Sequence, residues 1–309
     1  MSTIGARIVE LCGILSDYAE RRGSQHDPQS LSPGGAVSTK PDRSTRWYCE
    51  VDDEFTELQN LIGLAPRSDH KLVLSSPRVR SALPALHQLR AAYEYDKELA
   101  EAVAILDSED SSSRITRHVQ QESYWAVGSD LHRALAGCRN IAVAGSGPMP
   151  LTALAIASVL GARVTCIERM DEAVRLARQV IACFGYADRT ECVRAEITDV
   201  QELDAYDAVV GTVLLGVNSQ GSTYNRKLVI VGGLLNRMRP GTRLVYRDPH
   251  GLGRLLYPQM NLSGSQHINV LRLVPPMDQS RPYRSAIVIA RQKGHHEHDA
   301  GRSSVSLHP

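Results

Sequence analysis

A turn with two glycines follows an apolar stretch and offers a place for a nucleoside to bind. Residues 141–144 (IAVA) form an apolar run that is typical of a buried strand, and the run ends at Gly145-Ser146-Gly147. Residues without large side chains let the backbone turn sharply and approach a ligand closely. About 20 residues further on, a second short apolar run ends at Glu168, where an acid accepts hydrogen bonds from the hydroxyls of a ribose.

The elements that must position these groups alternate between strand and helix. Apolar residues at helical spacing predict helices over 151–160, 171–184 and 225–238, and short apolar runs predict strands at 164–167, 192–195 and 243–246. A further strand starts at 208 and is expected to end near 214–216. The last two strands, 267–273 and 285–290, are close in the chain. This order predicts an α/β fold with a mostly parallel sheet and an antiparallel edge, the layout of class I S-adenosylmethionine methyltransferase-like (Rossmann-type) domains.

The first third of the chain predicts a helical domain, residues 1–113. Apolar residues recur at helical spacing in 8–18, 47–64 and 79–106, the last as one or two helices. Between the first two, residues 21–46 are rich in Ser, Pro, Gly and charge, which predicts a flexible insertion because little apolar surface is available to bury. A helix is expected over 114–135, within a Rossmann-type domain of 114–293. The polar tail, 294–309, is expected to be disordered.

Composition favours a small-molecule partner. The 309 residues are 42% hydrophobic and carry a formal net charge of +1, so no global field attracts nucleic acid or an anionic membrane. Glu10 and Asp17 interrupt the apolar pattern near the start, and no long uncharged run occurs, so neither secretion nor membrane spanning is expected and we predict a cytoplasmic protein. The six cysteines show no CxxC pair, which indicates reduced, mostly buried thiols.

Two prolines decide which nucleoside suits the turn. Pro150 replaces the third glycine of a GxGxxG dinucleotide motif, and Pro148 removes an amide donor that a pyrophosphate would use. S-adenosylmethionine carries no phosphate. It needs close approach of the backbone, an acid for the ribose and a polar group for the adenine, and Glu168 and Asp199 follow successive strands where they meet those needs. The turn therefore favours S-adenosylmethionine over a nicotinamide dinucleotide.

Three segments resemble the nicotianamine synthases. Residues 145–152 (GSGPMPLT) are similar to the GSGPLPLTS signature of that family, 198–200 (TDV) to its MDV segment and 247–258 (RDPHGLGRLLYP) to its RSAHGARAFLYP segment. The resemblance covers roughly 98–290. Two departures concern the acceptor side: the aspartate-rich region of the plant enzymes is reduced to 168–171 (ERMD), and their FPYYxNY segment is present only as 123–125 (SYW). The pattern is closer to the bacterial enzymes of staphylopine- and pseudopaline-type pathways.

That branch implies one transfer of the aminobutanoyl (3-amino-3-carboxypropyl) group of S-adenosylmethionine to the α-amine of histidine, which releases methylthioadenosine and requires no metal. It also implies that the product passes to an opine dehydrogenase that completes a metallophore. The sequence keeps three alternatives open: a small-molecule methyltransferase, a nicotianamine synthase proper, and a non-enzymatic protein that binds S-adenosylmethionine or, through His295, His296 and His298, a metal. The enantiomer of histidine and the oligomeric state, a homodimer included, also stay open.

The resemblance points to Glu101 as the base that takes the proton of the amine, with Glu98 as the second choice, although both also fit solvated helix positions. Tyr124 would orient the amine or cover the sulfonium. Residues expected to bind S-adenosylmethionine are Gly145, Ser146, Gly147, Pro148, Glu168, Arg169, Glu196, Ile197, Thr198, Asp199, Leu214, Leu215 and Gly216. Residues expected to bind the acceptor, with guanidinium groups for carboxylates, are Arg247, His250, Arg254 and Tyr257. His250 fits a structural turn residue equally well, and Arg254 a surface charge.

Overall fold

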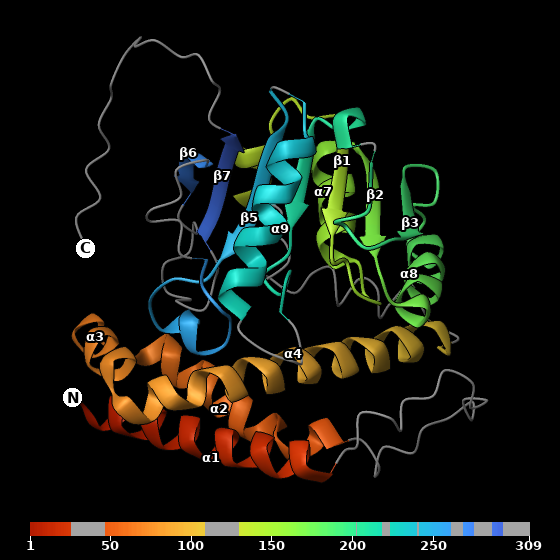
Figure 1. Ribbon diagram of the computed structural model, residues 1–309. Coiled ribbons are helices and arrows are strands. Elements are labelled where there is room, and N and C mark those ends of the chain that lie inside the picture. Colours follow the sequence, from red (N-terminus) through yellow and green to blue (C-terminus); the bar gives the residue numbers. More distant parts are fainter. Residues whose placement is uncertain are drawn as a thin grey trace, which may run out of the picture.

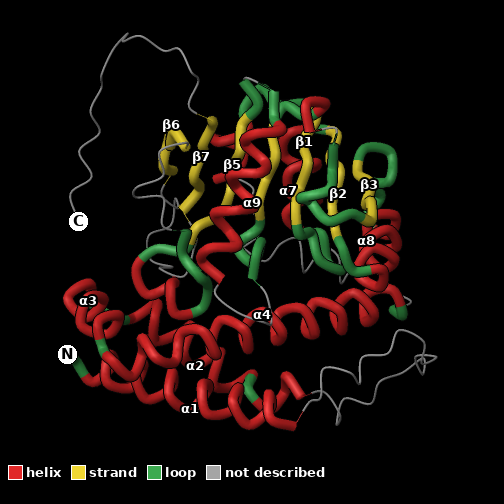
Figure 2. The backbone as a smooth tube through the Cα atoms, viewed as in Figure 1, coloured by secondary structure: helices red, strands yellow, loops and turns green. Residues whose placement is uncertain are grey.

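A layer of helices lies across one edge of a seven-stranded sheet (Figure 1). The computed structural model describes residues 1–25, 47–108, 130–201, 203–217, 223–239, 241–260, 268–274 and 286–292. The arrows of β1 (Asn140–Ala144), β2 (Arg163–Glu168) and β3 (Thr190–Arg194) point toward α4 (Pro77–Leu106). Loops that follow these strands therefore lie between the sheet and α4 (Figure 2), and this is where the site must be sought.

The N-terminal helices pack around an apolar core of their own. α1 (Thr3–Gln25), α2 (Asp52–Leu64) and α3 (Arg67–Ser75) gather on one side of α4, and a short 3-10 helix, η3 (Trp47–Glu50), precedes α2. The shared core includes Ile8, Leu11, Leu15, Phe55 and Leu86, all fully buried. Burial of side chains of this size contributes about 1.5 to 3 kcal/mol each, which exceeds what helix propensity alone supplies.

The helical layer differs from the prediction at several points. The segment 79–106 is one helix that continues through Pro84, and α3 was not predicted because its sequence carries few apolar residues. α1 extends to Gln25, so residues 21–25 are helical, and the predicted break at 21 is wrong there. In this extension, the guanidinium of Arg22 lies over the ring of Trp47 at 3.2 Å, a contact that favours the helical position of Arg22. The rest of the predicted insertion lies outside the described residues.

The sheet has the order β3-β2-β1-β4-β5-β7-β6. β4 (Ala208–Gly211) and β5 (Arg243–Asp248) continue the parallel part, and β7 (Ala286–Gln292) runs antiparallel to both β5 and β6 (Ile268–Val274). This arrangement confirms the predicted class I methyltransferase-like α/β fold with its antiparallel edge. The connecting elements are α7 (Leu151–Leu160), α8 (Asp171–Cys183), η4 (Leu203–Ala205), α9 (Thr223–Arg237) and η5 (Gly251–Leu255).

Alternate residues of the strands supply two separate cores. In β1, Ile141 and Val143 pack with α7 and α8, whereas Ala142 and Ala144 pack with α9. Right-handed crossovers explain this division, because the chain moves from β1 toward β3 on one face and returns from β4 to β5 on the other. Parallel strands covered on both faces read as continuous apolar runs, which is why the sequence revealed them.

Some boundaries of the Rossmann-type part were misplaced or are not described. β4 ends at Gly211 rather than near 214–216, because the N–H of Leu215 turns back to the carbonyl of Thr212 at 3.1 Å and the apolar run continues into a turn. Of the helix predicted over 114–135, only 130–135 are described, and they are helical. The domain boundaries after 113 and 293 and the whole tail lie outside the described residues and remain predictions.

Two further expectations concern thiols and membranes. All six cysteines are free, and four of them, Cys12, Cys138, Cys166 and Cys192, are buried. No helix in the described part of the chain is long and apolar enough to cross a membrane.

Asp207 joins the starts of several strands at the edge of the sheet opposite α4. Its Oδ2 accepts hydrogen bonds from the backbone N–H groups of Arg139 at 2.8 Å and Asn140 at 3.0 Å. Its Oδ1 accepts one from Arg239 Nη2 at 3.1 Å. The two backbone donors hold the pKa of this carboxyl below its usual value. Asp207 therefore stabilises the folded chain without touching the carboxyl edge.

We expect Asp207→Ala to lower the free energy of unfolding by about 0.5 to 1.5 kcal/mol at neutral pH, because two solvent-accessible backbone N–H groups lose a charged acceptor. Since the folded-state pKa is depressed, this contribution is complete above about pH 4, the unfolded pKa, and is lost as pH falls through the folded pKa. Urea unfolding of both proteins at a series of pH values checks this. Equal midpoints at pH 7 would contradict it.

Candidate active site

The glycine turn lies where the carboxyl end of β1 meets α4. Gly145 and Gly147 have φ values of +72° and +67°, in the left-handed region that favours glycine. Ser146 and Pro148 beside them are buried. In open α/β sheets, ligands bind in the crevice outside the carboxyl ends of the strands. The turn that the sequence singled out therefore occupies the position where a ligand is expected.

The carboxylate of Glu168 is bound to the turn from the end of β2. Its Oε2 accepts the N–H of Gly147 at 3.1 Å, and its Oε1 accepts the N–H groups of Arg169 at 2.8 Å and Met170 at 3.0 Å. A carboxylate offers about four lone-pair positions, so acceptor capacity remains for the hydroxyls of a ribose. Glu168 thus fixes the turn and can still hold a nucleoside.

Glu98 reaches the same turn from α4. A Cβ placed on Gly147 would lie 2.6 Å from Oε2 of Glu98, so only glycine leaves room for this carboxylate. Burial raises the pKa of Glu98 well above its usual value, and the charges of Glu94, Glu101 and Glu168 raise it further, while the cation of Arg247 opposes them. A carboxyl group whose pKa is raised is better suited to take up a proton from a bound ligand.

Of the two predicted bases, Glu98 is the one that the structure places against the turn, and the role of either glutamate as base stays a prediction. Glu98 touches the turn, whereas Glu101 follows it on the same helix face and acts on it through charge. Sequence could not separate them, because both are partly buried glutamates on one helix face and differ only in their position along α4. Tyr124 lies outside the described residues, so its role remains a prediction.

The loop after β3 holds the remaining candidates for the nucleoside end. Arg169 forms a 4.0 Å ion pair with Glu196, and Ile197 is buried with its carbonyl bound to Arg237 Nη2 at 3.1 Å. Thr198 and Asp199 are exposed beside it. The loop is therefore anchored by α9 and presents polar groups to solvent next to β2.

The turn after β4 adjoins the glycine turn. Thr212 Oγ1 donates to the carbonyl of Gly145 at 3.1 Å, and Leu215 approaches the same glycine, since a Cβ there would lie 3.8 Å from its Cδ1. Leu214 and Gly216, also predicted to bind the ligand, are partly exposed in this turn. Gly216 packs on Lys227 of α9, with 3.1 Å between its would-be Cβ and Lys227 Cγ.

Lys227 joins the loops that follow β4 and β5. Its buried ammonium donates to the carbonyls of Val213 at 2.8 Å and Pro258 at 2.7 Å. Burial lowers its pKa to about 8 and raises the pKa of neighbouring Asp248, also buried, to about 6. Lys227 lines a small cavity together with Thr212, Tyr246 and Arg247. The sequence did not single out Lys227 or Asp248, because nothing local shows that a lysine of an amphipathic helix turns inward.

The four residues at the end of β5 and after it that were predicted to bind the acceptor differ in where the structure places them. Arg247 is half-buried and its charge acts on Glu98, and Tyr257 is bound to α4. His250 and Arg254 are exposed. The carbonyl of Arg254 is bound to His87 Nε2 at 2.9 Å, so this residue secures η5 to α4 through its backbone. Arg247 and Tyr257 are therefore the two that face the site.

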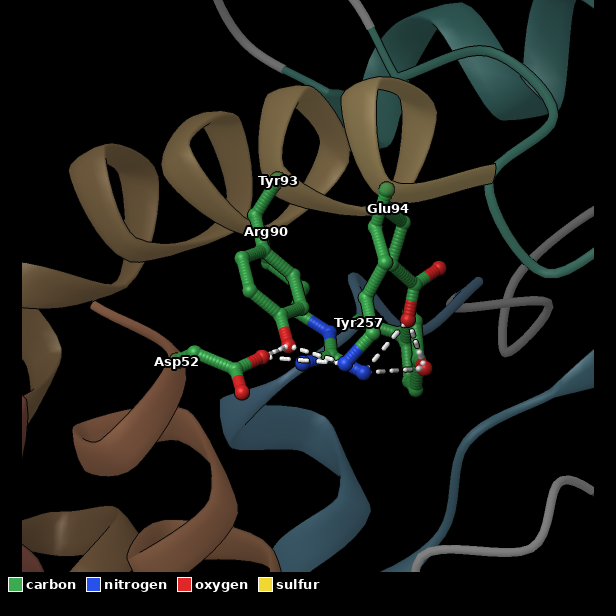
Figure 3. A network of polar contacts seen from close by, with 6 residues as sticks. Asp52, Arg90, Tyr93, Glu94 and Tyr257 are labelled. Carbon is green, nitrogen blue, oxygen red and sulfur yellow. Dashed lines mark hydrogen bonds and ion pairs between the residues drawn. The ribbon is translucent and has the colours of Figure 1, made fainter. Parts of the chain in front are cut away.

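A partly buried polar network attaches α4 to the segment after β5 (Figure 3). Arg90 Nη2 lies 2.5 Å from Glu94 Oε1, and the hydroxyl of Tyr257 donates to the same oxygen at 2.5 Å. On the far side, Tyr93 donates to Asp52, and Lys97 Nζ donates to Asp52 at 2.9 Å. These contacts bind α4 both to Tyr257 on the side of the sheet and to Asp52 of α2, and so fix the position of the helical layer relative to the sheet.

Glu94 and Tyr95 of α4 lie near the site but were not among the residues predicted from the sequence. Burial raises the pKa of Tyr95 to about 12, and the charges of Glu172 and Glu168 raise it too, which places this phenol beside the acid at the end of β2. Glu94, Glu98 and Glu101 are spaced i, i+4 and i+7, which puts them on one helix face. The sequence alone could therefore have indicated that Glu94 lies on the same helix face as the two predicted bases.

Within the described residues, no group of His, Cys, Asp and Glu side chains is arranged to hold a metal ion. The turn, Glu168 and the carboxylates of α4 instead suit a cationic organic ligand with a ribose, because they combine hydroxyl acceptors with negative charge.

Comparison with known proteins identifies the family. The model of the nicotianamine synthase protein family matches residues 44–297. The chain belongs to the nicotianamine synthase family. Nicotianamine synthase of Solanum lycopersicum is 30% identical over 159 residues, which are 50% of this chain and 47% of the relative, and nicotianamine synthase 3 of Arabidopsis thaliana is 30% identical over 145 residues, or 45% and 43%. The chain matches about half the length of these curated relatives.

Solved structures of a nicotianamine synthase share the fold. The crystal structure of MtNAS in complex with MTA and tNA superposes with a TM-score of 0.72 at 16% identity, covering 95% of this chain and 100% of that chain. A mutant of MtNAS in complex with S-adenosylmethionine gives 0.65 at 17% identity, covering 80% and 92%. The helical layer and the Rossmann-type sheet therefore recur together in the nicotianamine synthase family.

We expect Gly147→Ala to weaken binding of S-adenosylmethionine at least tenfold. The added Cβ would displace Glu98 and would strain a backbone at φ +67°, which costs on the order of 1 to 3 kcal/mol. Isothermal titration calorimetry measures this. Gly63→Ala is the matched control, because nothing lies within 4 Å of a Cβ there and its φ is not positive. Unchanged affinity in Gly147→Ala would show that the ligand does not approach this turn.

Proposed function

We propose that this protein transfers the aminobutanoyl group of S-adenosylmethionine to the α-amine of histidine and releases methylthioadenosine. The observation that carries the proposal is the carboxylate of Glu98 against the backbone of Gly147, in a chain of the nicotianamine synthase family. This contact brings a proton acceptor to the glycine turn over which the reacting sulfonium would lie. The transfer is one step in the synthesis of an opine metallophore, and an opine dehydrogenase consumes the product.

The residues of the turn fit S-adenosylmethionine as substrate. Gly145 and Gly147 allow close approach, Glu168 has acceptor capacity for the ribose, and Tyr95 lies beside that acid. Asp199 and Thr198 are polar groups for the adenine end. When bound, the substrate supplies a sulfonium that makes each attached carbon electrophilic, so the protein selects the reaction by which carbon it presents to the nucleophile.

Glu98 would accept the proton of the acceptor amine, because its carboxylate lies against the turn. The amine nitrogen forms a bond to the methylene carbon of the aminobutanoyl arm, and the bond between that carbon and sulfur breaks with its electron pair going to sulfur. Sulfur becomes a neutral thioether, and the proton from nitrogen passes to Glu98. Positioned proton transfer of this kind contributes about 10² to 10⁴ in rate.

The charge around Glu98 favours histidine over an anionic acceptor. The charges of Glu94, Glu101 and Glu168 act on Glu98, and Arg247 is the cation that opposes them there. An acceptor with a negative side chain would meet repulsion in this partly buried region, where charges are weakly screened. A neutral or cationic side chain would be accepted. Arg247 supplies a bidentate partner for the α-carboxylate.

Products distinguish this proposal from its alternatives. Incubation with S-adenosylmethionine and each enantiomer of histidine is expected to yield methylthioadenosine and histidine carrying one aminobutanoyl group, measured by mass spectrometry. Glu98→Gln is expected to lower kcat at least a hundredfold while S-adenosylmethionine still binds. S-adenosylhomocysteine as product would indicate a methyltransferase, and products built from several aminobutanoyl groups without histidine would indicate a nicotianamine synthase proper. Binding without consumption of either substrate would indicate a binding protein.

Dependence of the rate on pH tests the role of Glu98 separately. Because Glu98 must be ionised to accept a proton, kcat is expected to rise with pH through its raised pKa. Arg247→Gln removes an opposing cation and raises that pKa further, so the rise moves to higher pH. Glu101→Gln removes a like charge and moves the rise to lower pH. Shifts of both variants in the same direction would exclude Glu98 as the titrating group.

A further inference from the structure

Glu94 and Tyr95 point to opposite sides of Glu98. Successive residues of an α-helix point about 100° apart, and residues one turn apart share a face. Tyr95 lies beside Glu168 at the end of β2, on the side where the ribose is expected. Glu94 is bound to Tyr257, which follows β5, on the side of Arg247. Glu98 thus lies between the part of the site expected to bind S-adenosylmethionine and the part expected to bind the acceptor. Glu94 lies in the acceptor part.

One oxygen of Glu94 is held from two directions. Arg90 and Tyr257 both contact Oε1, each at 2.5 Å, and Arg90 Nη2 also donates to the Tyr257 hydroxyl at 3.3 Å. Arg90 is itself fixed, since its side chain is only 6% exposed and lies over the rings of Phe55 and Tyr93, each 5.0 Å away. The carboxylate therefore has one orientation, which a site needs in order to select between ligands.

The other oxygen is available to a ligand. Among the described residues, Oε2 of Glu94 has no hydrogen-bond partner, and Figure 3 shows it pointing away from Arg90 and Tyr257. The side chain of Glu94 is 18% exposed, so water reaches it only in part. A carboxylate oxygen in such a place gains from a donor that a ligand brings, and a ligand without a donor leaves it unpaired.

We propose that Glu94 selects the acceptor by accepting, at Oε2, a hydrogen bond from an N–H of the acceptor's side chain. This inference rests on the proposed function and identifies the acceptor class as an amino acid with a nitrogen donor in its side chain. Glu94 and Glu98 are one helical turn apart, with roughly 5 to 6 Å between their Cβ atoms, a separation that the α-amine and the imidazole of histidine can bridge. With Arg247 on the α-carboxylate, three groups then bind three positions of one molecule.

A histidine analogue without the donor tests the assignment. The acceptors are histidine and 3-(2-thienyl)alanine, whose ring has the same number of members and no N–H. The wild type is expected to prefer histidine by about tenfold to a hundredfold in kcat/KM. In Glu94→Gln, Oε1 of the amide stays with Arg90 and Tyr257, and its NH2 faces the ring of the acceptor. Because this NH2 cannot accept and can donate only to the unprotonated nitrogen of a neutral imidazole, the full preference is expected to be lost through a higher KM for histidine, with kcat for thienylalanine retained.

Two variants control for folding, because Glu94→Gln leaves Arg90 buried without its counter-charge. The double variant Arg90→Met/Glu94→Gln removes both charges and places a flexible apolar side chain among the rings of Phe55, Tyr93 and Tyr257. It is expected to unfold near the wild-type midpoint and still lack the preference. Tyr257→Phe keeps the carboxylate and loosens it, so a reduced preference is expected.

The outcomes separate the two proposals. If the wild type transfers to histidine and Glu94→Gln keeps the full preference for it, Glu94 does not select the acceptor, while the proposed function stands. If both acceptors lose activity by the same factor in Glu94→Gln and in the double variant, the residue is structural and the inference is overturned. If the wild type transfers the group to neither acceptor, the proposed function itself fails, and the acceptor class inferred from it fails too.

Discussion

The contact between the carboxylate of Glu98 and the backbone of Gly147 is the constraint on which the arrangement of this protein depends. It requires a residue without a Cβ in the turn. It also requires α4 to cross the carboxyl edge of the sheet at one distance from the strands and with one rotation about its own axis. The long helix meets these conditions because both of its sides are packed. One side lies on α1 and its apolar core, and the other side lies on the Rossmann-type part through Ala102 and Ile105.

The clustered negative charges of the site destabilise the folded protein and at the same time make Glu98 a better proton acceptor. Several carboxylates share a partly buried space, which raises the pKa of Glu98 at a cost to folding, since like charges repel most where water is scarce. The fold offsets part of this cost locally. Backbone N–H groups bind Glu168, and Arg90 and Tyr257 bind Glu94. A cationic substrate would offset the remainder, so binding and the ionisation of Glu98 are coupled.

The helical layer and the sheet form the site together. Neither part holds it alone, because the proposed base, Glu98, lies on α4, the turn follows β1, the acid proposed for the ribose ends β2 and Arg247 lies on β5. Polar contacts set the spacing between these parts: His87 binds the carbonyl of Arg254, Glu94 binds Tyr257, and Lys227 binds the loops after β4 and β5. The same segment that carries Arg247 therefore also anchors the helical layer.

The sequence by itself determined the sheet, the glycine turn and Glu168, because strands buried on both faces, left-handed glycines and an acid at a strand end leave local patterns. Only the tertiary structure decided which carboxylate meets the turn. Glu98 and Glu101 differ by three positions on one helix, and their order depends on how far α4 is rotated by packing against α1 and the sheet. The same holds for Glu94, since its partners Arg90 and Tyr257 are 167 residues apart in the chain. Such a contact leaves no local pattern, and it exists only when both layers are packed together.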